Sequence, residues 1–199
     1  MKTPSLSNSR SSVFQRGVAA VELALVAIPF FLLLFGVMEF GRLFYVWNTA
    51  QEVTRHAARQ AVVTNFKDNA AMTAIRQSAV FRVNAGTLPA APEISDLNVV
   101  IRYLNADQNQ ISGANMPADP GDNIAACLEK ETSCIRYVEV CLSLPLAATT
   151  TCSEGQPIPF QPMIGLFATS GPNSTNLLGI RIPLSTVRMP AESLGYRAP

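Results

Sequence analysis

The longest run of hydrophobic positions lies near the N-terminus. Residues 18–38 read VAAVELALVAIPFFLLLFGVM, a stretch of 21 residues in which Glu22 is the single charge. As a helix rising 1.5 Å per residue, this run covers a bilayer core of about 30 Å. A helix buried in a soluble core is the alternative, but such a helix normally keeps a polar stripe, and none follows Glu22. The pattern therefore predicts a membrane-spanning helix, which Pro29 should bend only slightly.

The helix is expected to continue beyond the apolar run. Over residues 40–62, apolar side chains recur at steps of three and four, with polar residues between them, which is the pattern of an amphipathic helix. Tyr45 and Trp47 follow the run where amphipathic rings favour a membrane interface. A helix from residue 18 to about 63 would measure on the order of 70 Å. Its outer half, residues 39–63, is expected to support an exported domain.

Residues 64–199 are predicted to form that domain. Helical spacing over 65–83 indicates a second helix, which Pro89 and Pro92 should end at the start of a linker. Segments rich in β-branched residues predict three strands, over 97–104, 135–144 and 179–189. Pro183 restricts the last of them to an edge or a bulge. The expected fold class is α+β, with the long N-terminal helix packed on a small antiparallel sheet.

Two long connections interrupt these elements. Residues 105–131 hold acidic and amide side chains among glycines and prolines, which raises the possibility of calcium binding. Their spacing matches no EF-hand, and a solvated loop is the preferred interpretation. Residues 145–176 form the second connection. Its apolar patch is either core or a contact surface, with core the commoner outcome. The patch comprises Met163, Ile164, Leu166 and Phe167.

Composition and motifs exclude several function classes. The net charge is +1, charged residues make up 15% of the chain, and no basic stripe is interleaved with aromatics, so no nucleic-acid partner is expected. The sequence contains no phosphate loop, dinucleotide fingerprint or nucleophile elbow. His56 has no serine or cysteine nucleophile motif beside it and is interpreted as a helix-surface residue. Neither enzymatic activity nor a cofactor is expected.

The cysteines point to disulfides. There are four, all beyond the apolar run: Cys127, Cys134, Cys141 and Cys152. They form no CxxC pair, which argues against zinc, whereas an even number in a segment expected to be exported favours two disulfides. Three pairings are possible. Cys127 with Cys134 and Cys141 with Cys152 is preferred, because both loops are short.

The first 17 residues have the composition of a leader. They are rich in serine and basic, without an acidic residue, which favours a cytoplasmic N-terminus even though arginines also follow the apolar run. A secretory signal peptide is the competing explanation. Its apolar region would be shorter and would end in a small-residue cleavage site, whereas this run ends in GVMEF. The helix is therefore expected to remain as an anchor, with residues 64–199 in the periplasm.

The junction of leader and apolar run resembles a class III prepilin signal. Gly17 is followed by the small apolar start at Val18 and by Glu22, the fifth residue after the glycine. The resemblance implies that a membrane-embedded prepilin peptidase cuts between Gly17 and Val18. The new amine would lie about one turn from Glu22, so that the amine of one subunit can offset the carboxylate of the next. The alternative is that Glu22 extends its carboxylate to cytoplasmic water.

A longer block, residues 16–60, is similar to the TadE-like family of tight-adherence (Flp/Tad) pilus systems. The family pattern joins the glycine and glutamate to an acidic residue with F-G-R, an asparagine and repeated A-R. Leu23 stands where phenylalanine is usual. The matching positions are Gly17, Val21, Glu22, Ala24, Leu25, Pro29, Gly36, Glu39, Phe40, Gly41, Arg42, Asn48, Arg55, Ala58 and Arg59.

The resemblance implies a minor pilin, TadE or TadF, that takes part in pilus assembly and adhesion. It would be a single-pass protein of the bacterial inner membrane. Its implied partners are membrane lipid, other Tad pilins and minor pilins, the prepilin peptidase and the Tad assembly platform. Two alternatives stay open. One is a pseudopilin of type II secretion or a type IVa pilus, although those usually have phenylalanine where this chain has Val18. The other is an uncleaved bitopic envelope protein that binds a ligand or partner through its outer domain.

Overall fold

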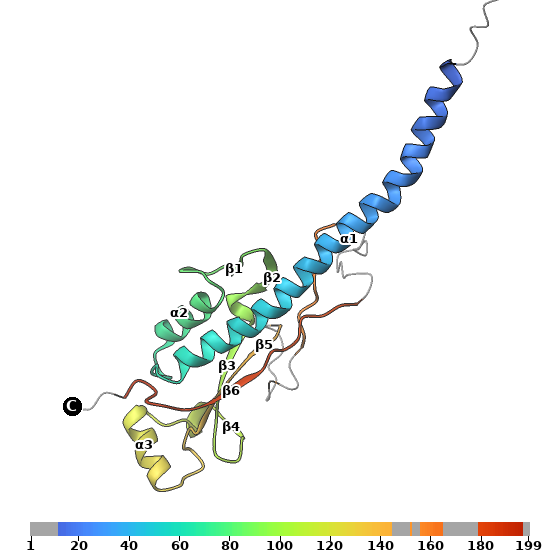
Figure 1. The fold of residues 1–199 in the computed structure, drawn as a ribbon. Helices are drawn as coiled ribbons and strands as arrows, with labels where there is room; N and C mark the ends of the chain where they lie inside the picture. The colour runs from blue at the N-terminus through green and yellow to red at the C-terminus, as the bar shows by residue number, and fades with distance from the viewer. Residues whose placement is uncertain (1–11, 145–151, 153–155, 165–178, 197–199) are drawn as a thin grey trace, which may run out of the picture. The chain divides into compact units, whose positions relative to one another are not determined.

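A computed structural model describes residues 12–144, 152, 156–164 and 179–196, with side chains from residue 17 onward. The chain divides into two compact units, residues 1–42 and 43–199. Its elements (Figure 1) are α1 (Ser12–Ala61), α2 (Asn69–Ala79), β1 (Thr87–Leu88), β2 (Ala91–Ser95), η1 (Asp96–Asn98), β3 (Val99–Leu104), β4 (Gln110–Ile111), η2 (Gly113–Asn115), α3 (Pro120–Leu128), β5 (Tyr137–Leu142) and β6 (Val187–Pro190). The expected α+β class is confirmed.

Helix α1 contains the whole apolar run. It begins at Ser12, earlier than expected, ends at Ala61 and passes through Pro29. In the part of the chain that the structure describes, it is the one helix long and apolar enough to cross a membrane, and none of its most apolar window is buried. This exposure is the opposite of what a soluble-core helix would show. The residues before Ser12, which belong to the predicted leader, lie outside the described part.

The second half of α1 carries one buried face. Every third or fourth residue along it is fully buried: Val46, Ala50, Val53, Ala57 and Ala61. These side chains form one hydrophobic core with Ile75 of α2 and Val138 and Val140 of β5. The alanines let α1 lie close to its neighbours, because they add little width to that face. The predicted amphipathic half of the helix is thus confirmed from Leu43 onward.

The main sheet has four antiparallel strands in the order β4-β3-β5-β6. Strands β3 and β5 lie within the predicted segments 97–104 and 135–144, although both are shorter. Of the segment 179–189, only its end enters the sheet, as β6. Arg181 forms an isolated bridge to Pro159. The prediction that the third strand is confined to an edge is confirmed.

Two predictions for the connections were wrong. Residues 105–131 are not simply a solvated loop, because they contain β4, η2 and α3. Asp119 caps α3 by accepting from the Asp122 backbone N–H at 2.9 Å, and Pro120 follows at the first turn. The expected linker after Pro89 is instead the β1–β2 hairpin. The second helix is confirmed within shorter bounds, with Asp68 as its N-cap.

The disulfides are Cys127–Cys134 and Cys141–Cys152, the preferred pairing. The first ties the end of α3 to the segment before β5. The second ties β5 to Cys152. Of the predicted apolar patch in the second connection, Met163 is 77% exposed and Ile164 half-buried. Its other two members, Leu166 and Phe167, lie outside the described residues.

Candidate functional site: the N-terminal helix

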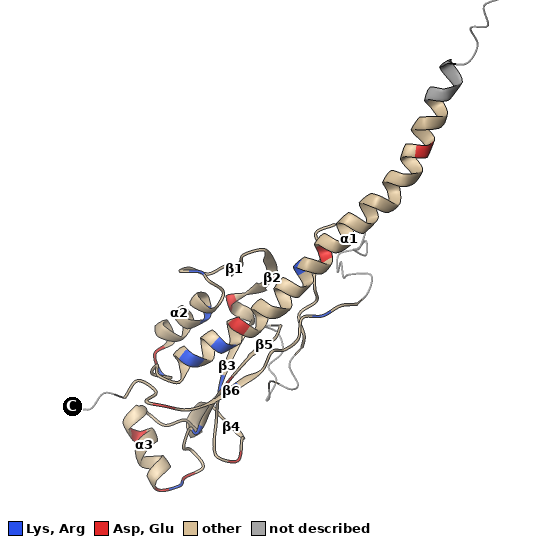
Figure 2. Ribbon diagram, viewed as in Figure 1, with Lys and Arg blue, Asp and Glu red and all other residues tan. Residues whose placement is uncertain are grey.

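The predicted processing site lies inside α1. Gly17, Val18 and Glu22 are all exposed there, with Glu22 about one turn beyond Val18. Glu22 is the only charged residue in 18–38, and Figure 2 shows acidic colour at one place in the upper part of α1. Within the described residues, Glu22 makes no hydrogen bond or ion pair. A carboxylate in an apolar segment is costly without a partner, and the described part of the chain supplies none to Glu22.

Three glycines of α1 have no packing reason to be glycine. At Gly17, Gly36 and Gly41, an added Cβ would meet nothing within 4 Å. Glycine inside a helix costs about 1 kcal/mol relative to alanine. The fold of the single chain therefore gives no steric explanation for these residues. Recognition by another molecule is the kind of requirement that would explain Gly17.

In the E-F-G-R block, residues 39–42, the two charged side chains are shielded from solvent and the phenylalanine ring is exposed. The Arg42 Nη1 atom lies 3.9 Å from Glu39 Oε2, and the two side chains are 9% and 10% exposed. Phe40 is 60% exposed. A shielded pair of opposite charges needs close partners to offset its lost hydration. Glu39 and Arg42 thus form a shielded pair within α1, and the Phe40 ring beside them stays largely exposed.

The remaining motif residues form an exposed polar stripe. Asn48, Arg55 and Arg59 are all exposed, and their spacing of seven and four residues places them within about 40° around the helix axis. Arg55 donates to Glu52 Oε1 at 3.0 Å, an exposed pair that contributes little to stability. Figure 2 shows these charges along the second half of α1. The stripe faces away from the core that Val53 and Ala57 enter, so its residues do not hold this fold together.

His56, predicted to be a helix-surface residue, is half-buried. Its Nε2 atom lies 3.2 Å from Gln60 Nε2, and Ser78 Oγ donates to Gln60 Oε1 at 3.1 Å. The Phe81 ring centroid is 6.5 Å from the imidazole. These contacts join α1 to α2. They bring no acid or nucleophile to the ring, and the arrangement is that of a packing contact.

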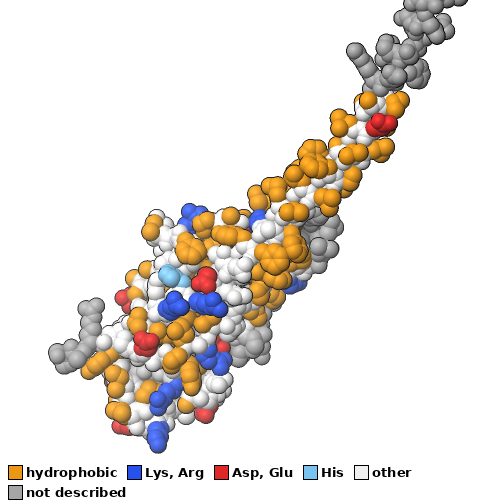
Figure 3. All heavy atoms as spheres, in the orientation of Figure 1, with side chains coloured by type: hydrophobic (Ala, Val, Ile, Leu, Met, Phe, Trp, Pro, Cys, Tyr) orange, Lys and Arg blue, Asp and Glu red, His pale blue; other side chains and the backbone are white. Residues whose placement is uncertain are grey.

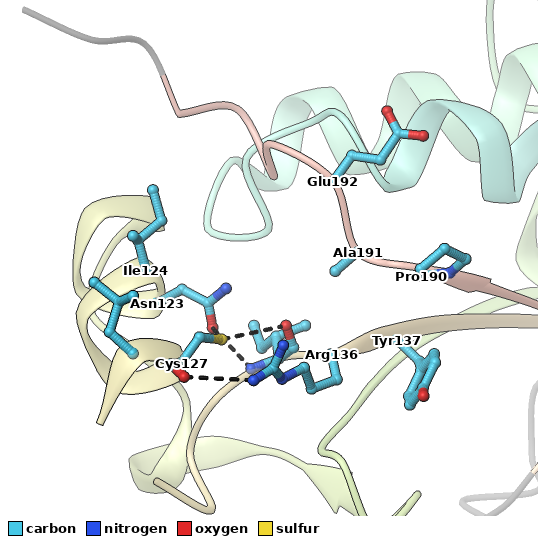
Figure 4. Close-up of a pocket in the computed structure, with 10 residues that line it drawn as sticks. Asn123, Ile124, Cys127, Arg136, Tyr137, Pro190, Ala191 and Glu192 are labelled. Carbon is cyan, nitrogen blue, oxygen red and sulfur yellow. Dashed lines mark hydrogen bonds between the residues drawn. The ribbon is translucent and has the colours of Figure 1, made fainter. Parts of the chain in front are cut away.

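A cavity beside α3 was not predicted. It measures about 490 Å³ and lies between α3, the start of β5 and the segment after β6 (Figure 4). Asn123 Oδ1 accepts from the Ile135 backbone N–H at 2.7 Å, and Arg136 Nη2 donates to the Cys127 carbonyl at 3.4 Å. These bonds fasten α3 to β5. The Asn123 amide and the Arg136 guanidinium, which line the cavity, are thus already used in joining α3 to β5.

The described residues contain no cluster of three or more His, Cys, Asp and Glu side chains that could hold a metal. Two of the acidic and amide residues of 105–131 have structural roles, since Asp119 caps α3 and Asn123 accepts from the Ile135 backbone N–H before β5. Burial raises the pKa of Tyr103 to about 12, and the nearby Arg76 charge lowers it in part. This tyrosine belongs to the core and not to a site.

Comparison with known proteins identifies the helix. No curated protein and no solved structure matches the chain. The family model described as TadE-like protein matches residues 17–59. The match begins at the predicted scissile glycine and ends at Arg59 of the polar stripe. Residues 17–59 are therefore similar to the TadE-like family, which confirms the resemblance inferred from the sequence.

Proposed function

We propose that this protein is a minor pilin or pseudopilin of a tight-adherence (Flp/Tad) pilus assembly system. The observation that carries the proposal is the exposed apolar helix that starts with Gly17 and Glu22 within the TadE-like segment. A helix exposed over its whole apolar run needs an apolar environment from outside the chain. The inner membrane and the helices of other pilins supply it.

In this proposal residues 1–17 are a cytoplasmic leader, 18–38 cross the inner membrane once, and 64–199 form a periplasmic domain. A prepilin peptidase cuts after Gly17. The open space around Gly17 supports this role, because nothing in the fold requires a glycine there. The two disulfides also fit an oxidising compartment.

Glu22 then acts in assembly. In the bilayer its carboxylate is paired by the new Val18 amine of a neighbouring subunit, and the two helices dock side by side. The partners are other Tad pilins and minor pilins, delivered through the inner-membrane assembly platform. The protein is a substrate of the peptidase and has no catalytic role of its own.

The proposal is tested by the N-terminal sequence of the protein purified from membranes, with and without an active prepilin peptidase. We expect a mature start at Val18 only when the peptidase is active. Gly17→Ala should leave the leader attached. Gly36→Ala is the matched control, because Gly36 has equally open surroundings in the same helix.

Two results would contradict the proposal. An intact Met1 beside an active peptidase that processes another pilin in the same cells would favour the uncleaved envelope protein. Recovery of the protein from the soluble fraction with its leader attached would exclude membrane insertion altogether.

A further inference from the structure

A second cleft lies beside β4, at the edge of the main sheet. It measures about 550 Å³, within the range of about 300–1,000 Å³ that small-molecule sites occupy. Three separate segments form it: the chain after β3 at Asn105, residues 110–117 with β4 and η2, and residues 132–133 before β5. Its shape is therefore set by the fold of the domain and not by a single loop.

The walls of this cleft are fastened to one another. Asn105 is buried, its Oδ1 accepts from the Asn109 backbone N–H at 2.9 Å, and its Nδ2 donates to the Thr132 carbonyl at 3.5 Å. Thr132 also lies within the loop that the Cys127–Cys134 disulfide closes. Because the cleft is preformed, a ligand would lose little affinity to the ordering of the protein.

Charged side chains are excluded from the lining. None of the described residues that line the cleft is charged. The surrounding segment, residues 105–133, nevertheless carries six charges, and Figure 3 shows both signs of charge on the viewed face of this unit. A bound ion needs opposite charges or strong hydrogen bonds to offset its lost hydration, so the lining favours a neutral ligand. The six are Asp107, Asp119, Asp122, Glu129, Lys130 and Glu131.

The lining combines a buried apolar floor with an exposed polar rim. Ile111 and Pro117 are buried, and Met116 is half-buried against the hydrophobic core. Gln110 and Asn115 are exposed, and within the described residues their side-chain amides make no hydrogen bond. Each amide offers two N–H donors and a carbonyl acceptor. A sugar ring has the matching chemistry, because its C–H faces are apolar and its hydroxyl groups donate and accept.

We propose that this cleft, named the amide cleft after Gln110 and Asn115, binds a neutral sugar. The two amides and the Thr132 hydroxyl bind the sugar hydroxyl groups, and a ring face covers Met116. The described lining residues include no aromatic ring on which a sugar could stack. Binding is therefore expected to be weak, with a Kd on the order of 1 mM. The inference goes beyond pilus assembly and does not depend on cleavage after Gly17.

A peptide is the competing occupant. Many peptides bind beside a sheet by adding a strand to its edge, where main-chain hydrogen bonds supply the affinity. The edge strand at the amide cleft is β4, which has two residues and offers few backbone groups for that mode. The short edge therefore favours a sugar over a peptide.

The test uses the full chain in micelles of dodecylphosphocholine, a detergent without a sugar headgroup that could compete. Saturation-transfer NMR detects weak contacts between the protein and a ligand. The neutral probes are maltotriose, cellotriose and triacetylchitotriose. Trigalacturonate is an anionic sugar of the same length, and a capped peptide of serine and asparagine represents the competing occupant.

Two variants remove the rim amides, Gln110→Ala and Asn115→Ala. The matched control is Asn84→Ala, which removes an exposed amide between α2 and β1 that does not line the cleft. All three side chains are exposed, so the domain should keep its fold, and thermal unfolding checks this. Each rim variant should weaken binding of a neutral sugar by about threefold to tenfold, because one amide hydrogen-bonding group is lost. The control should bind as the natural protein does.

We expect saturation transfer to at least one neutral trisaccharide and much less to trigalacturonate and the peptide. Absence of transfer to all three neutral sugars would overturn the inference, and so would equal transfer to trigalacturonate or to the peptide. If Asn84→Ala weakens binding as much as the rim variants do, the sugar binds outside the amide cleft and the inference fails. None of these results changes the N-terminal sequence by which the proposed function is tested.

Discussion

Arg188 on the edge strand β6 donates to Glu139 on β5 across 2.7 Å. Glu139 is 4% exposed and stands in register with Arg102 of β3 on its other side. The carboxylate is thus the centre of a row of charges across three strands. Because β6 is short, this row of side chains helps to hold the edge strand in register.

Replacing Glu139 by glutamine should destabilise the domain by about 2–4 kcal/mol, because Arg188 would lose the shielded carboxylate with which it forms an ion pair. Chemical unfolding of the full chain in detergent micelles measures this free energy. Glu52→Gln is the matched control, since the Glu52–Arg55 pair is exposed and should change stability by less than about 0.5 kcal/mol. Equal changes in the free energy of unfolding for the two substitutions would show that the row across the sheet contributes no more to stability than an exposed ion pair.

Gly195 lets the C-terminal segment pack closely against the residues that follow α1. Its φ is +82°, and an added Cβ would lie 2.6 Å from the Asn65 backbone nitrogen, while the neighbouring Leu194 N–H donates to the Val62 carbonyl at 3.1 Å. Gly195→Ala should therefore lower stability by about 2–4 kcal/mol, from backbone strain and from the clash together. Thermal unfolding of the full chain measures the loss.

Gly113 provides the control for this prediction. It has a φ of +60°, but nothing lies within 4 Å of its added Cβ. Gly113→Ala should show the strain alone, about 1 kcal/mol. If Gly195→Ala lowers stability no further than Gly113→Ala, the C-terminal segment does not pack against Asn65 as described.

Ionisation of Tyr103 should make the free energy of unfolding of the domain depend on pH in the alkaline range. Burial raises its pKa to about 12, so the folded state holds the phenolic proton more tightly than the unfolded state, whose pKa is about 10. The resulting stability is complete below pH 10 and is lost as the pH rises toward 12. By pH 11 the loss should be about 1 kcal/mol. The variant Tyr103→Phe removes the contact of the hydroxyl with Met72 Sδ at 3.3 Å. It also removes this dependence of stability on pH.

The measurement is the difference in unfolding free energy between the natural protein and Tyr103→Phe at pH 8 and pH 11. The natural protein should lose about 1 kcal/mol relative to the variant over this interval. A constant difference would mean that Tyr103 is not buried in the folded domain.

The helix was predictable because its signal is local. An uninterrupted apolar run and the spacing from Gly17 to Glu22 are visible without tertiary information, and the family resemblance lies on the same segment. The disulfide pairing was also predictable, since the shortest loops, closed by Cys127–Cys134 and Cys141–Cys152, were the ones formed. What the sequence could not show is which helix residues are shielded. Glu39 and Arg42 look like surface charges until neighbours are placed around them.

The missed elements were those that depend on contacts far along the chain. Helix α3 has nine residues, and its capping Asp119 was predicted to lie in a solvated loop, although Asp followed by Pro at a helix start is a capping signal. The β1–β2 hairpin contains Pro92, which argues against a strand unless the strand lies at an edge. Tyr45 supports its turn from 44 residues away. Short elements of this kind are stabilised by tertiary partners, which periodicity does not reveal.

Glu22 gives the most direct test of the assembly proposal. Glu22→Ala removes the carboxylate that a neighbouring Val18 amine would pair with, so the protein should stay in the membrane but crosslink less to other pilins. Loss of one charge-assisted hydrogen bond in an apolar setting should weaken association by about 1.5–3 kcal/mol, or roughly tenfold to a hundredfold. Glu52→Ala, at an exposed acid farther along the same helix, is the control and should crosslink normally. Recovery of Glu22→Ala with its pilin partners at the natural level, after cleavage behind Gly17, would rule out the charge pair while leaving membrane insertion intact.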